Sequence, residues 1–170
     1  MTPSDLKSGL ALRYKVIYLP AQVAINEELF PIFEAYVKQG GRLVADAPAA
    51  WWDEHGKVLN TARGSDFEKI FGASIKDFQY SSNVPRRLKN HYFNGFLMEL
   101  APTSAIVTER FQTGEPAVTI NRVGKGFAVL LSPDVSFSLK LPGNDFVEKW
   151  VIHYIMEGLS VPYACKNAIV

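Results

Sequence analysis

The chain has 170 residues, of which 48% are hydrophobic and 21% are charged, and its 18 basic and 17 acidic residues give a formal net charge of +1. This is the composition of one globular domain, and it lacks the basic excess that steers proteins to nucleic acid or anionic membranes, so we expect neither as a partner. No apolar run approaches the ~20 residues of a membrane span, and the single cysteine, Cys165, excludes an internal disulfide.

Residues 1–13 are predicted to be a lead-in without a regular element, because proline, serine and glycine interrupt the scattered leucines. The domain is expected to cover residues 14–161, and residues 162–170 to form a short tail. The N-terminus lacks the charged and apolar regions of a signal peptide. The cellular compartment stays open, since a mature fragment of a secreted precursor would have the same N-terminus.

A strand, a helix and a second strand are predicted between residues 15 and 45. The runs at 15–19 and 42–45 are too continuously apolar for half-exposed strands. The intervening helix begins with Asn26 as its cap and ends at Gly40 or Gly41, and Pro31 predicts a bent or late start. A strand–helix–strand crossover implies parallel strands in a sheet that is buried on both faces.

The loop after the second strand leaves the carboxyl end of a parallel strand, where ligand crevices form in open α/β sheets. On one interpretation it presents an aromatic platform, Trp51 and Trp52, beside Asp53, Glu54 and His55. On the other, the tryptophans pack over the end of the sheet and the polar residues form a turn. The sequence leaves both open, and we take this segment as the candidate binding site.

The helical period returns once before the chain becomes strand-rich. Ser65 is predicted to cap a short helix, with Glu68 three residues on and Gly72 as its stop, after a possible short strand at 57–59. Strands are then expected in five segments: 74–80, 91–100, 105–111, 117–121 and 127–131.

Tight turns at 112–115 and 123–126 predict an antiparallel meander over residues 105–131. Its last strand is apolar throughout, which indicates a place inside the main sheet. The charged residues at 86–89 are predicted to form a solvated loop. A final helix is expected to open at 142–145, to pack Val147, Trp150 and Tyr154 on the sheet, and to end at Gly158.

Few residues suggest chemistry. A nucleophilic enzyme on such a fold needs a serine or cysteine at a sharp strand-to-helix turn, but the turn after residue 45 holds Asp46, Ala47 and Pro48. The three histidines and Cys165 lack metal-ligand spacing, and the loop after the first strand has no glycine for phosphate binding. We therefore expect no catalytic residue, metal or cofactor.

Several segments, taken in order, resemble the middle domain of family 42 β-galactosidases. They are residues 14–21 (YKVIYLPA), 27–29 (EEL), 36–44 (YVKQGGRLV), 53–58 (DEHGKV), 66–72 (DFEKIFG) and 115–128 (EPAVTINRVGKGFA). The last is the most specific, and together they cover residues 14–158.

The resemblance implies an α/β fold of the flavodoxin-like, class I glutamine amidotransferase-like type: a mainly parallel sheet with an antiparallel meander and helices on both faces. It also implies a non-catalytic domain that helps a barrel-bearing enzyme form trimers, so that Asp46-Ala47-Pro48 is a degenerate nucleophile turn. The family's usual first strand and helix precede the segment matching Tyr14, and the barrel is absent. A fragment, or a diverged relative attached to another hydrolase, is therefore implied.

Three hypotheses follow. The first is a non-catalytic domain of a carbohydrate-active enzyme that binds the parent enzyme's other domains and forms a homo-oligomer, with residues 51–55 as a subunit contact or a sugar face beside a neighbouring active site. The second is a small hydrolase or sugar-utilisation protein of the same fold that uses Asp46, Asp53, Glu54 and His55 as acid and base groups. The third is a carbohydrate-binding module.

Overall fold

The structure is a computed structural model, and it describes residues 2–140 and 145–157, without the side chains of residues 81–85. Some expectations lie outside this range. They concern the opening of the last helix at 142–144, its end at Gly158, the tail at 162–170 and Cys165.

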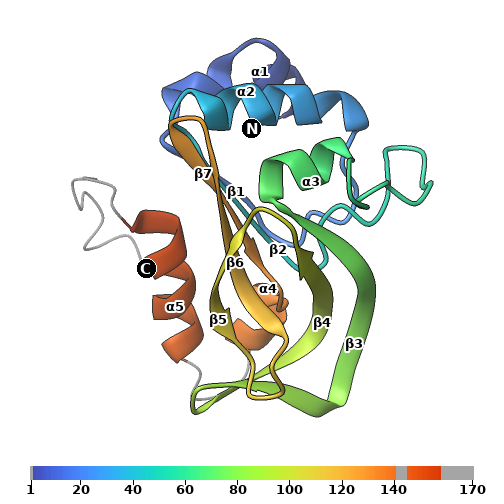
Figure 1. Cartoon of the computed structure of the whole chain (residues 1–170), viewed down its shortest axis with the longest axis vertical. Coiled ribbons are helices and arrows are strands. Elements are labelled where there is room, and N and C mark those ends of the chain that lie inside the picture. The colour runs from blue at the N-terminus through green and yellow to red at the C-terminus, as the bar shows by residue number, and fades with distance from the viewer. Residues whose placement is uncertain (1, 141–144, 158–170) are drawn as a thin grey trace.

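A five-stranded mixed sheet forms the centre of the molecule, with strand order β1-β2-β7-β6-β5 (Figure 1). Strands β1 (Val16–Leu19), β2 (Arg42–Asp46) and β7 (Gly126–Leu131) are parallel. Strands β6 (Pro116–Val123) and β5 (Ile106–Arg110) continue the sheet as an antiparallel meander. The predicted crossover, the meander and the internal position of its last strand are confirmed.

The crossover helix begins late, as Pro31 predicted. A 3-10 turn at Glu27–Leu29 precedes α2 (Phe30–Lys38), and the Asn26 side chain accepts a hydrogen bond from the Glu28 N–H at 2.8 Å. Gly40, with φ of +114°, follows the helix in a backbone conformation that other residues rarely adopt. Local signals therefore fix both ends of the helix.

The N-terminal lead-in was wrongly expected to lack structure. It contains α1 (Pro3–Lys7) and a 3-10 turn at Leu10–Arg13, and Thr2 and Asp5 form a capping box at the start of α1. Leu6 and Ala11 are buried in the core beside α2. Packing against a neighbouring helix stabilises a segment that is too short to be helical alone.

The strand pair after α3 (Asp66–Phe71) forms a separate two-stranded sheet of β3 (Ala73–Leu88) and β4 (His91–Pro102). Ser65 caps α3 and Gly72 ends it, as predicted. Residues 86–88 continue β3 instead of forming the expected loop. Their charges have partners, because Arg86 lies 3.5 Å from Glu115 and Arg87 lies over the Tyr92 ring. Residues 57–59 form only an isolated bridge.

Helices cover both faces of the main sheet. On one face, α2 and α3 pack with Leu43 and Leu130. On the other, α4 (Val135–Leu139), which the sequence did not predict, and α5 (Asp145–Met156) pack with Val44 and Val129.

Strand β1 departs from the expectation of full burial. It lies at the edge of the sheet with β2 as its neighbour, and its residues are half-buried except for Ile17. A continuous apolar run does not distinguish an edge strand from a central one.

Candidate functional site

The turn at the end of β2 is closed. Asp46 is 0% exposed, and Ala47, Ala49 and Ala50 are equally buried. The Asp46 carboxyl group accepts three hydrogen bonds: from the Tyr18 hydroxyl at 2.9 Å, from the Ala21 N–H at 2.5 Å and from the Val135 N–H at 3.2 Å. It joins the ends of β1 and β2 to the start of α4.

Burial sets the protonation of this turn. It raises the pKa of Asp46 to about 6, against the hydrogen bonds from Ala21, Tyr18 and Val135, which lower it. Burial also raises the pKa of the Tyr18 hydroxyl, with the Asp46 charge as a further cause, so this hydroxyl remains a donor. The carboxyl group is bound inside the protein and does not face solvent.

The two tryptophans have different roles. Trp51 is stacked between Trp52 and Phe78, with ring centroids 5.1 Å and 4.6 Å away, and Phe96 meets it edge-on. Trp52 is 39% exposed. The expected two-ring platform is therefore one exposed ring, Trp52, with Trp51 behind it.

Asp53 organises the polar turn that follows. Its Oδ1 accepts hydrogen bonds from the His55 N–H at 2.9 Å and the Lys57 N–H at 2.8 Å, and its own N–H donates to the Lys57 carbonyl at 2.8 Å. The hydrogen bond from Lys57 is the largest cause that lowers the pKa of Asp53. Glu54 and His55 are exposed neighbours, with 3.6 Å between Oε1 and Nε2.

The structure does not bring the four candidate acid and base groups together. Asp46 is enclosed at the end of the sheet, whereas Asp53, Glu54 and His55 belong to an exposed turn. The geometry therefore gives no support to the hypothesis that all four act on one bond. Within residues 2–140 and 145–157, no three His, Cys, Asp or Glu side chains lie where they could hold a metal ion, and no helix is long and apolar enough to cross a membrane.

The surface of the domain has two hollows that the sequence did not predict. One, of about 310 Å³, is lined by Leu6, Leu19 and Glu54, among others. The other is a groove of about 650 Å³ on the main sheet, whose lining includes Ile106 and Phe127. The signal for the groove is present in the sequence as apolar residues in β5, β6 and β7, but only the strand register brings them together.

Comparison with known proteins identifies the domain. Residues 8–157 match the family model of the beta-galactosidase trimerisation domain. The chain belongs to this family. No curated protein sequence matches this trimerisation domain.

Solved structures with the same fold include Gan42B, a GH42 beta-galactosidase from G. stearothermophilus, at a TM-score of 0.67 and 22% identity over 83% of this chain and 22% of that one. The beta-galactosidase from Bacillus circulans sp. alkalophilus gives a TM-score of 0.68 and 16% identity, over 84% of this chain and 22% of that one. A cytoplasmic protein from Salmonella typhimurium gives a TM-score of 0.60 and 13% sequence identity, over 91% of this chain and 75% of that one. The trimerisation domain thus spans about a fifth of the length of these β-galactosidases.

Proposed function

We propose that this chain is a non-catalytic assembly domain that holds together copies of a carbohydrate-active parent enzyme of the β-galactosidase type. Its membership of the trimerisation domain family supports this role. The observation that carries the non-catalytic part is the burial of Asp46. A catalytic group must reach its substrate, and this one is enclosed at the turn where a nucleophile would be presented.

We further propose that the scaffold is flavodoxin-like, of the class I glutamine amidotransferase type. The parallel order β1-β2-β7 and the helices on both faces support this assignment. The turn at Asp46 then occupies the position of the amidotransferase nucleophile, and its side chain serves the fold.

The segment from Trp51 to His55 borders a neighbouring active site in this proposal. Trp52 combines an exposed apolar ring with the adjacent carboxylate of Glu54, a combination that suits a protein partner or a sugar. Nucleic acid and membranes are not proposed as partners, because the net charge is near zero.

Analytical ultracentrifugation of the purified chain between 1 and 100 µM, together with assays on nitrophenyl glycosides, esters and amides, tests the proposal. We expect a concentration-dependent trimer and no turnover. A chain that stays monomeric throughout, or turnover that is lost in Asp46→Asn, would contradict it.

A further inference from the structure

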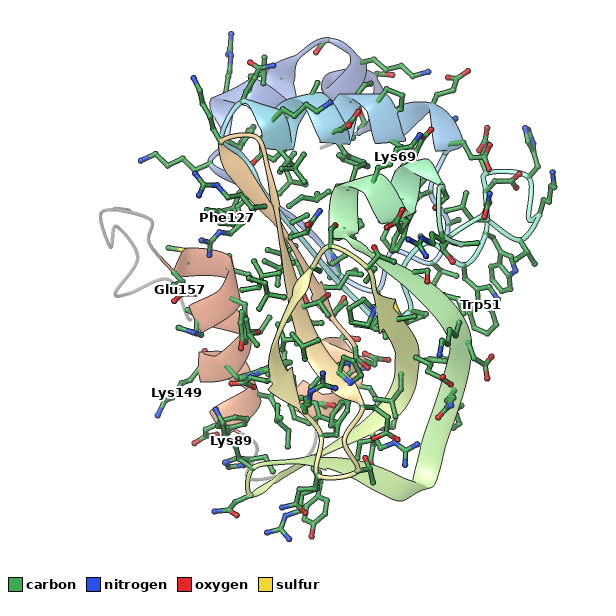
Figure 2. The ribbon with its side chains drawn as sticks, in the orientation of Figure 1. Trp51, Lys69, Lys89, Phe127, Lys149 and Glu157 are labelled. Atoms are coloured by element: carbon green, nitrogen blue, oxygen red, sulfur yellow. The ribbon has the colours of Figure 1, made fainter. Side chains whose placement is uncertain are left out.

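Helix α5 leaves part of its sheet face uncovered. The register aligns Arg42, Phe127 and Arg122 in one row across β2, β7 and β6, and aligns Ile120 with Ile106 in the next row across β6 and β5. Helix α5 contacts this face at Glu109, which accepts from Trp150 Nε1 at 2.8 Å, and at the Arg42 end of the first row, where Arg42 donates to the Tyr154 carbonyl at 2.9 Å. The uncovered part therefore holds Phe127, Arg122, Ile120 and Ile106. Figure 2 shows Phe127 beyond the end of α5 that carries Glu157.

This uncovered area is the groove of about 650 Å³, with an apolar floor and a basic rim. Ile106 is 71% exposed and Phe127 is 37% exposed; they lie on β5 and β7, with β6 between them, and both line the groove. Arg122, in the lining, has no ion-pair partner within the described part of the chain. Arg42 lies beside the lining, over the Phe127 ring at 5.8 Å and with the charge of Glu157 nearby. The groove therefore suits an apolar segment that also carries negative charge.

The turn at residues 52–58, which we call the tryptophan knob, has that character, because its two carboxylates outnumber Lys57 and leave a formal net charge of −1. Trp52 and Val58, the latter 69% exposed, flank the carboxylates of Asp53 and Glu54. The three hydrogen bonds between Asp53 and residues 55 and 57 hold the turn in shape, and Trp51 supports the exposed ring. A preformed knob loses little conformational entropy on docking.

The knob and the groove lie on different sides of the molecule. In Figure 2, Trp51 is at the right edge and Phe127 at the upper left. A closed trimer is built from heterologous contacts, in which one patch of each copy meets a different patch of the next. Two complementary patches on separate sides of one chain meet that requirement.

We propose that the tryptophan knob of one copy docks into the groove of the next copy, with Trp52 on Ile106 and Phe127 and with Glu54 facing Arg122. This inference rests on the proposed function. It adds which two surfaces meet and that the contact is head-to-tail.

Two surface variants test the groove and the knob one at a time. Ile106→Asp places a negative charge in the groove, and Trp52→Ala removes the ring of the knob; each leaves the other patch intact. We expect each variant alone to weaken trimer formation at least tenfold in sedimentation experiments. Leu12→Asp, at another exposed apolar residue (55% exposed), is the matched control and should assemble like the wild type. Circular dichroism checks that all variants fold.

Mixing the two variants gives the decisive result. The Ile106→Asp chain keeps a knob and the Trp52→Ala chain keeps a groove, so native mass spectrometry should find 1:1 heterodimers and no larger ring. Glu54→Arg and Arg122→Glu should each weaken assembly, and the double variant should restore it. A wild-type trimer that neither variant weakens, or a mixture without heterodimers, overturns this inference but leaves the assembly function standing. A wild type that is monomeric at 100 µM overturns both.

Discussion

Asp46 gives the sharpest test of the idea that the turn serves the fold. Replacing it with alanine leaves the buried N–H of Val135 and the partly buried N–H of Ala21 without their acceptor. Each unsatisfied buried donor costs about 1–3 kcal/mol, so we expect Asp46→Ala to lower the free energy of unfolding by about 2–6 kcal/mol near pH 5. Against a typical total of about 5–15 kcal/mol, that loss is large.

The pH dependence of stability follows from the raised pKa of Asp46. Its pKa is about 6 in the folded protein and 3.8 in the reference state, so folding favours the protonated form. The stabilisation is fully present below about pH 3.8 and is lost as the pH rises through about 6. At about 1.36 kcal/mol per unit, this group loses about 3 kcal/mol in all, of which about 2 kcal/mol falls between pH 4.5 and 7.5.

Urea unfolding of the wild type and Asp46→Asn at pH 4.5, 6 and 7.5, at one protein concentration, measures this loss. The asparagine cannot ionise, so the stability advantage of the wild type over the variant should shrink by about 2 kcal/mol across the series. Asp77→Asn, at an exposed aspartate, controls for the loss of one charge. An advantage that is constant or grows with pH would refute the reasoning.

Three further predictions concern packing. Trp51→Ala should cost about 3–5 kcal/mol and Trp52→Ala about 1 kcal/mol in thermal or urea unfolding, because Trp51 is stacked on both faces; equal losses would contradict this. Gly126→Ala should lower stability by about 1–3 kcal/mol or more, since a Cβ there would meet the backbone oxygens of Gly41 and Val37. Gly114→Ala serves as the comparison for backbone strain without a clash, because its φ is +96° and nothing lies within 4 Å of the added Cβ. Trp150→Phe, which removes the hydrogen bond to Glu109, should cost about 1–3 kcal/mol by the same measurement, and an unchanged midpoint would show that the bond contributes nothing.

Elements whose signals are local could be predicted from the sequence. Asn26 caps the 3-10 turn that leads into α2, and Ser65 caps α3, because a capping side chain bonds within its own turn. Helix α1 was missed, although Thr2 and Asp5 form a capping box, because its stability depends on burying Leu6 beside α2.

The candidate site could be predicted only in part. The segment at the end of β2 was identified from topology, but the stacking of Trp51 on Phe78 joins residues far apart in the chain. The groove depends on the pairing of Ile106 with Ile120 and of Arg122 with Phe127. Pairing between strands is set by tertiary structure, and no local pattern states it.

The proposed docking also restricts how the site can meet a sugar. Trp51 has both faces covered, so Trp52 is the ring of this pair that can stack on a ligand, and docking in the next copy's groove would bury it. A sugar and a neighbouring subunit should therefore compete for Trp52. We expect galactose at 100 mM to leave tryptophan fluorescence of the trimer unchanged, and any response to appear in the Ile106→Asp variant, whose knob is free. A response of equal size in both states would show that Trp52 stays accessible after assembly, and the knob would then be a sugar face and not the subunit contact.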